Sequence, residues 1–172
     1  MFLYALARLG ARVPTTAEIV LAGGAALLLG GYITRGTNDG DVIAASPKLS
    51  ALRTAIAEVA EELDLAEAWL NDGVVAWADA LPPDYRTRLH TVGTFGGLTV
   101  RRLDRRDLVV LKVLAQREQD REDLRQLAPT PDEIAFIHAE LPRIARAFPD
   151  RAQRMEYYLT QHVGPAGGEA AS

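Results

Sequence analysis

Two acidic residues, Asp39 and Asp41, stand one residue apart just before the apolar run of residues 42–45. If a strand begins at this point, side chains at positions i and i+2 project to the same face of it. Neighbouring carboxylates supply the hard oxygen ligands that Mg²⁺ or Mn²⁺ prefers. A metal bound there could in turn hold the phosphates of a nucleotide. The plainer alternative is that both acids are turn and strand-entry residues.

A pair of glycines, Gly23 and Gly24, precedes these acids in the chain. It follows the apolar run 18–22 and is followed by helix-forming residues 25–29, a pattern that predicts a strand, a tight turn and a short helix. Such a turn would present backbone N–H groups to a phosphate without obstruction by a side chain. It could also be only a sharp strand-to-helix connection.

The rest of the chain predicts the elements that position these residues. Apolar and glycine patterns indicate a strand at 41–44, a helix over 48–63, two short helices within 66–80 that separate at Asn71-Asp72-Gly73, a strand pair within 89–103 and helices from 104 to about 163. Thr130, Pro131 and Glu133 have the spacing of a helix capping box. We expect one domain over 1–172, with a mixed α/β core at 15–105, a helical part at 106–172 and a loose tail after the last helix.

Composition excludes several classes of protein. The 172 residues are 48% hydrophobic and carry a net charge of −4, which argues against a generic nucleic-acid binder despite the basic cluster Arg101, Arg102, Arg105 and Arg106. The chain has no cysteine, which rules out disulfides and a thiol nucleophile. The uncharged stretch 19–33 is too short and too rich in glycine to span a membrane. Residues 1–14 lack the features of a secretory signal, so we expect a cytoplasmic protein.

Three segments in this order resemble the DNA polymerase beta-like nucleotidyltransferases, and most closely the small bacterial branch that includes the AbiEii-type toxin enzymes. They are GGAALLL at 23–29, RGTNDGDVI at 35–43 and DRRDLVVLKVLAQREQDREDLRQL at 104–127. The resemblance covers about residues 15–127. It implies a small mixed sheet flanked by helices, and metal-dependent transfer of a nucleoside monophosphate from an NTP.

The resemblance also implies roles for individual residues. Asp39 and Asp41 would bind Mg²⁺ or Mn²⁺. The phosphates would be held by Gly23 and Gly24, with Arg35 and Thr37 near the β- and γ-phosphates. The catalytic residues implied by the resemblance are Asp39, Asp41 and Lys112.

A further motif of the resembled branch, here called the later motif, begins at Lys112 and continues to Asp123. Lys112 and Asp120 would position the nucleotide or the acceptor, and Arg117 and Asp123 belong to the same motif. The alternative is that residues 120–123 form a solvated helix face stabilised by pairs of opposite charge at i,i+4 spacing.

The chain departs from the resembled family at two places. Gly40 stands between the two aspartates where a large aliphatic residue is usual, and we expect it to loosen the start of the strand. The candidate strand at 98–103 offers no third carboxylate, and Asp104, the nearest acid, has the position of a helix cap.

Two functions are therefore compatible with the sequence. The first is a nucleotidyltransferase that modifies an RNA, a protein or a small molecule, as one member of a toxin–antitoxin or defence pair. The second is a catalytically degenerate module that binds nucleotide or a partner protein and acts as an antitoxin or regulator. Asp39, Asp41 and Lys112 favour the first function, whereas Gly40 and the missing acid favour the second.

Overall fold

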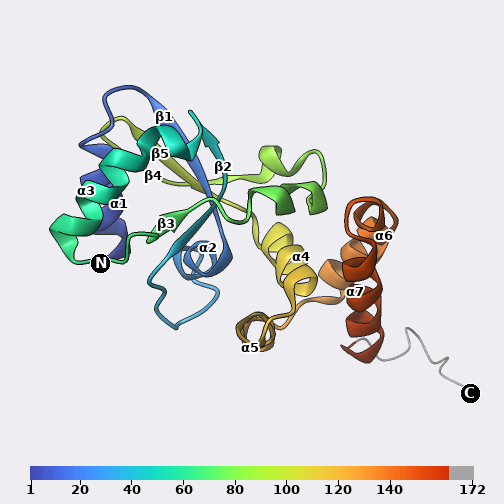
Figure 1. Ribbon diagram of the computed structural model, residues 1–172. Helices are drawn as coiled ribbons and strands as arrows, with labels where there is room; N and C mark the ends of the chain where they lie inside the picture. The colour runs from blue at the N-terminus through green and yellow to red at the C-terminus, as the bar shows by residue number, and fades with distance from the viewer. Residues whose placement is uncertain (163–172) are drawn as a thin grey trace, which may run out of the picture. The chain divides into compact units, whose positions relative to one another are not determined.

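The computed structural model describes residues 1–162, which form two compact units (Figure 1). The first unit contains Met1–Ala78 and Pro83–Leu108, and the second contains Asp79–Pro82 and the chain from Val109 onward. A single domain over 1–172 stays a prediction. The tail that we expected to be loose lies outside the described residues.

The first unit is built on a five-stranded mixed sheet with the strand order β3-β2-β1-β5-β4. The strands are β1 (Ala17–Ala22), β2 (Gly40–Ser46), β3 (Leu70–Asn71), β4 (His90–Phe95) and β5 (Leu98–Arg102). The central strand β1 pairs antiparallel with β2 and parallel with β5. Its residues Ile19, Val20 and Leu21 are each at most 1% exposed, as expected for a strand that is covered on both faces. The predicted mixed α/β class, with a sheet flanked by helices, is confirmed.

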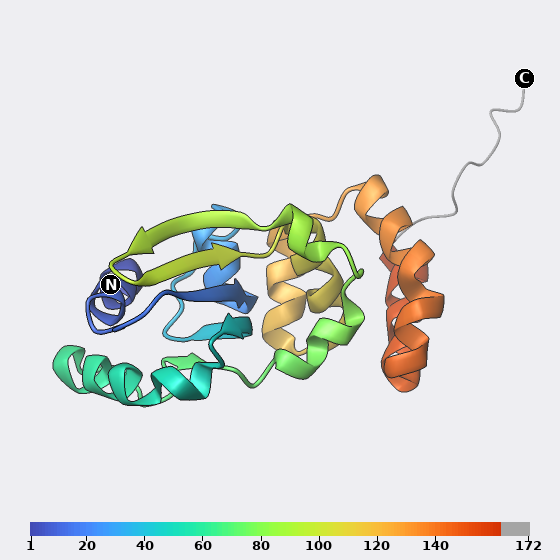
Figure 2. The ribbon, with the colours of Figure 1, turned by 90° about the horizontal axis from the view of Figure 1, so that it is seen from above.

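Helices of the first unit pack along this sheet (Figures 1 and 2). They are α1 (Phe2–Gly10), α2 (Gly23–Leu29), α3 (Arg53–Leu63) and the 3-10 turn η1 (Leu49–Leu52). The chain also forms the 3-10 turns η2 (Val75–Ala80) and η3 (Tyr85–Arg88), of which η2 runs into the second unit. Helix α1 contacts α3 and β4, whereas α2 contacts β1 and β2. The first of the two short helices expected within 66–80 is absent. In its place β3 pairs with the edge of β2, because strand pairing outweighs local helical preference there.

The helices of the chain's second half are α4 (Arg105–Ala115), α5 (Glu118–Leu127), α6 (Pro131–Ala147) and α7 (Pro149–His162), of which α4 begins in the first unit. Helices α6 and α7 pack against each other and are joined at Phe148 (Figure 1). The predicted capping box at the start of α6 is confirmed: Glu133 N donates to Thr130 Oγ1 at 3.2 Å, and Thr130 N donates to Glu133 Oε2 at 2.9 Å. No helix within residues 1–162 has the length and apolar character that a membrane span requires.

Gly40 does not loosen the start of β2, contrary to the expectation from sequence. Its N–H donates to Trp69 O at 2.7 Å, and a Cβ atom at Gly40 would lie 2.6 Å from Phe2 Cζ and 3.0 Å from Leu70 Cδ1. The Phe2 ring meets the Trp69 ring edge to face, with centroids 6.0 Å apart. An aromatic side chain from α1 therefore fills the space that a side chain between the two aspartates would occupy.

We expect Gly40→Ala to destabilise the protein by about 1–3 kcal/mol, because the added methyl group overpacks against Phe2. In a Phe2→Leu background the cost should shrink, with a coupling energy of about 0.5–3 kcal/mol in a double-mutant cycle measured by urea unfolding. Gly36→Ala is the control, since nothing lies within 4 Å of a Cβ atom there. Additive effects of the Gly40 and Phe2 substitutions would contradict this packing account.

Candidate functional site

The turn from β1 into α2 lies directly against the start of β2. Ala22, the last residue of β1, pairs with Asp41 across the antiparallel ladder. Gly23 then turns the chain with a φ of +59°, and a Cβ atom there would overlap Oδ2 of Asp41. Only glycine adopts this conformation without strain and leaves room for the carboxylate. The Asp41 side chain is therefore held against the backbone of the glycine turn.

The loop before β2 returns to the second glycine of the turn. A Cβ atom at Gly24 would lie 3.2 Å from Arg35 Nη2 and 3.3 Å from Thr37 Oγ1. The Thr37 hydroxyl lies 3.0 Å both from Asp39 O and from Asp39 Oδ1. Strand β2 begins only at Gly40, so the exposed Asp39 belongs to this loop and not to the strand. These contacts therefore bring together the six residues that were predicted in this part of the chain, which are Gly23, Gly24, Arg35, Thr37, Asp39 and Asp41.

Asn71 is a member of this site that the sequence analysis treated only as part of a turn. It ends β3 and pairs with Asp41 in the parallel ladder between β2 and β3. Its Nδ2 donates to Asp41 Oδ1 at 3.4 Å, and its Oδ1 accepts from Gly73 N at 3.1 Å. The bond from Gly73 fixes which end of the amide faces Asp41. The only signal in the sequence was the Asn-Asp-Gly turn, which says nothing about a partner across the sheet.

Strand β5, on the other side of β1, has no acidic residue and ends in two arginines. Arg102 on β5 pairs with Leu21 of β1, and its guanidinium lies over the Tyr32 ring, 5.4 Å from the ring centroid. Arg105 lies at the same distance from that ring. Arg101, another member of the basic cluster, forms an ion pair with Glu18 at 3.0 Å. Much of the cluster is therefore engaged within the first unit.

Asp104 is a helix cap, as its position in the sequence predicted. Its Oδ1 accepts from Arg106 N at 2.9 Å at the start of α4, and its Oδ2 lies 2.9 Å from His90 Nε2. Burial raises the pKa of Asp104, but the hydrogen bonds from His90 and from the backbone outweigh burial and hold this pKa below its usual value. Across residues 1–162 no group of three or more His, Cys, Asp or Glu side chains has the geometry to hold a metal ion.

The later motif forms a buried ion-pair network in the second unit. Lys112 is 5% exposed, and its Nζ lies 2.6 Å from Asp120 Oδ1 and 2.7 Å from Asp123 Oδ2. Arg117 Nε binds the other oxygen of Asp120 at 2.8 Å, and Gln119 Nε2 donates to Asp123 Oδ1 at 3.2 Å. Burial raises the pKa of Asp120, but hydrogen bonds from Arg117 and Lys112 bring it below its usual value.

The alternative of a solvated face over 120–123 is wrong for its two aspartates. Asp120 and Asp123 are at most 1% exposed, whereas Arg121 and Glu122 between them are exposed. The two aspartates face Lys112 on α4, so the spacing along α5 serves an interaction between helices. The positioning of a nucleotide or acceptor by these residues stays a prediction.

Comparison with known proteins agrees with the class that the sequence resemblance implies. Residues 5–129 match the model of a family described as "Nucleotidyltransferase of unknown function (DUF6036)". The chain therefore belongs to this nucleotidyltransferase family. Neither the comparison with curated proteins nor the comparison with solved structures gave a match. Membership of the AbiEii-type branch stays a prediction.

Gly23→Ala should destabilise the protein more than Gly31→Ala, as measured by urea unfolding. Both glycines have a positive φ, so each alanine costs about 1–2 kcal/mol for the left-handed backbone. The methyl group at position 23 must also displace the Asp41 carboxylate, whereas nothing lies within 4 Å of a Cβ atom at position 31. Equal costs at the two positions would show that Asp41 does not lie against the turn.

Lys112→Met should cost about 3–5 kcal/mol at neutral pH, because it leaves two buried carboxylates without their shared cation. The pKa of Asp120 is lowered in the folded protein, so the ionised Asp120 carboxylate stabilises the fold at pH values above its unfolded-state pKa. This contribution to the free energy of unfolding is lost as the pH falls through the folded-state pKa of Asp120. In the variant, burial without Lys112 favours the protonated form of Asp120. The difference in unfolding free energy between wild type and variant should therefore narrow as the pH is lowered towards the carboxyl range. Lys48→Met, at an exposed lysine, is the control and should change stability little at any pH.

Proposed function

We propose that the first unit catalyses the metal-dependent transfer of a nucleoside monophosphate from an NTP to an RNA, a protein or a small molecule. Membership of a nucleotidyltransferase family supports the class of reaction. The observation that carries the assignment to a site is the contact between the Gly23 turn and the Asp41 carboxylate. A place in a toxin–antitoxin or defence pair, with a cognate partner protein, rests on the sequence resemblance alone.

Two carboxylates are a suitable set of protein ligands for Mg²⁺ or Mn²⁺. Mg²⁺ is commonly bound by one or two carboxylates while substrate phosphates and water provide its other ligands. Asp39 and Asp41 supply these oxygens, and Thr37 and Asn71 orient them through the hydrogen bonds described above. A bound metal would neutralise charge on the phosphates and polarise the reacting phosphoryl group.

The remaining residues of the site suit the polyphosphate. Gly23 and Gly24 are the first two residues of α2, where backbone N–H groups have no partner within the helix and can bind a phosphate. The guanidinium of Arg35 beside Gly24 can form charge-assisted hydrogen bonds with phosphate oxygens. In the transfer, an acceptor hydroxyl oxygen bonds to the α-phosphorus and the bond to the β-phosphate oxygen breaks. Pyrophosphate leaves, and the hydroxyl proton passes to water. Lys112 is not assigned a role in this proposal, because it is buried between Asp120 and Asp123.

One observation favours the second candidate, a module that binds nucleotide without turnover. Strand β5 beside β1 has no acidic residue, and Asp104 is committed to capping α4 and to His90. The site therefore has two carboxylates where the resemblance leads us to expect three. Such a protein would retain nucleotide binding at Gly23, Gly24 and Arg35 and would lack label transfer.

Incubation with each α-labelled NTP and Mg²⁺ or Mn²⁺, with total RNA and protein extract as acceptors, should give a labelled product. Asp41→Asn should reduce the rate by about 100-fold or more, because phosphoryl-charge stabilisation worth several kcal/mol is lost. Asp64→Asn makes the same change at an exposed acid outside the site, and Asn tolerates the left-handed backbone of that position. Label transfer that survives Asp41→Asn would refute the proposed site, and nucleotide binding by wild type without any transfer would favour the binding module.

A further inference from the structure

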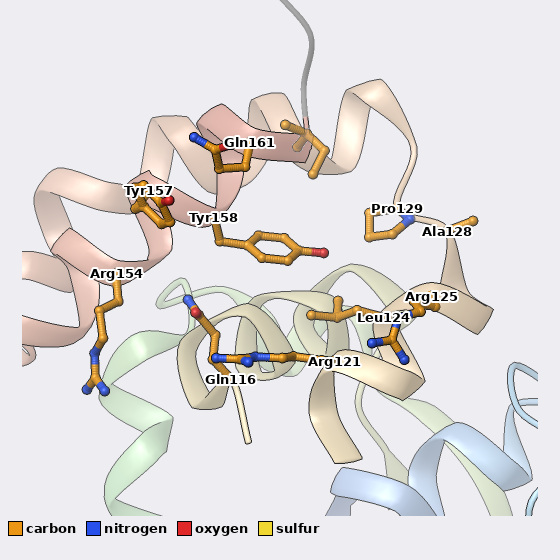
Figure 3. A pocket seen from close by; sticks show the side chains of 11 residues that line it. Gln116, Arg121, Leu124, Arg125, Ala128, Pro129, Arg154, Tyr157, Tyr158 and Gln161 are labelled. Carbon is orange, nitrogen blue, oxygen red and sulfur yellow. The ribbon is translucent and has the colours of Figure 1, made fainter. Parts of the chain in front are cut away.

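A cavity of about 710 Å³ opens in the second unit between α5 and α7 (Figure 3). Its size is within the range of about 300–1,000 Å³ that is typical of small-molecule sites. Arg121, Leu124 and Arg125 line it from α5, while Arg154 and Tyr158 line it from α7. None of these residues belongs to the site at the glycine turn.

The charged side chains of the cavity suit an anion. Its lining includes three arginines and no acidic residue, although the whole chain carries a net charge of −4. Arg125 pairs with Glu122 on its own helix, but neither Arg121 nor Arg154 has an ion-pair partner within residues 1–162. Arg121 and Arg125 also stand at i,i+4 on α5, a spacing at which like charges destabilise a helix. An anion between the two helices would relieve this repulsion and pair with both remaining guanidinium groups.

The aromatic side chains of the cavity suit a planar ring. Tyr158 extends from α7 across the cavity towards Ala128 and Pro129 (Figure 3), and the neighbouring Tyr157 is 68% exposed. Tyr158 itself is half-buried. Aromatic rings beside arginines are the combination by which proteins bind the bases and phosphates of single-stranded nucleic acids.

We propose that this cavity binds a nucleotide unit, with the phosphate at Arg121 and Arg154 and the base against Tyr158. The unit can be a free nucleotide or one residue of a single-stranded RNA, since both present the same phosphate and base. This site is independent of the proposed transfer reaction. Helix α7 also lies beyond residue 129, where the match to the nucleotidyltransferase family ends.

The test measures binding of AMP by calorimetry and of a labelled single-stranded RNA of about 8 nucleotides, within the usual site sizes for such strands, by fluorescence anisotropy. All variants carry Asp41→Asn and are assayed in EDTA, which removes metal-dependent binding at the first site, so that any remaining binding there is the same in every variant. Arg121→Gln and Arg154→Gln should each weaken binding by about tenfold or more, as expected for loss of a charge-assisted hydrogen bond. Arg146→Gln removes an exposed charge from α6 outside the cavity and is the matched control.

Tyr158 provides the second test, because it distinguishes stacking from charge attraction. Tyr158→Leu should weaken binding about fivefold or more, whereas Tyr158→Phe keeps the ring and should bind like the parent. Binding of AMP with this pattern identifies the free nucleotide as a ligand, and binding of RNA alone identifies the strand. Absence of binding to both probes would overturn the proposal, as would equal losses in Arg154→Gln and Arg146→Gln with wild-type-like unfolding curves.

Discussion

The contact between the Gly23 backbone and the Asp41 carboxylate is the constraint on which the candidate site depends. The antiparallel ladder of β1 and β2 shifts its register after Val20 and so brings Ala22 opposite Asp41. The chain must then leave β1 with a positive φ and without a Cβ atom, since any side chain would occupy the position of the carboxylate. The same backbone turn that connects β1 to α2 therefore places an acid beside the first N–H groups of that helix.

Several acidic residues outside the candidate site are buried and paired with a cation, unlike Asp39 within it. Asp107 is fully buried and receives two hydrogen bonds from Arg88, and Asp120 and Asp123 share Lys112. Burial of a carboxylate without such a cation is strongly unfavourable, so these acids are committed to their ion pairs and are not available to a ligand. Asp39, by contrast, is exposed and accepts a hydrogen bond from the neutral hydroxyl of Thr37. Its charge remains accessible to a ligand from solution.

Local patterns in the sequence predicted the features that local interactions determine. The glycine turn, the strands beside it and the Thr130 capping box all follow from propensity and backbone geometry over a few residues. The role of Asn71 could not be predicted, because a two-residue strand exists only through its pairing with β2. The filling of the space at Gly40 likewise depends on Phe2, a residue from a distant part of the chain. Charge spacing along α5 could not distinguish a solvated face from a buried network, since only the position of Lys112 separates the two.

A site with two acids has a thermodynamic consequence for the proposed reaction. If Asp39 and Asp41 are the protein's metal ligands, the other positions around Mg²⁺ must be occupied by water or by phosphate oxygens. Phosphates that bind the turn at Gly24 and Arg35 would then complete the metal site, and the metal would in turn strengthen the binding of the phosphates. Such coupling is reciprocal, so the affinity for metal must rise with bound nucleotide by the same factor as the affinity for nucleotide rises with bound metal. A third carboxylate would reduce this dependence, because the protein alone would hold the metal more tightly. The absence of an acid from β5 therefore favours joint binding of metal and nucleotide over a permanently bound metal.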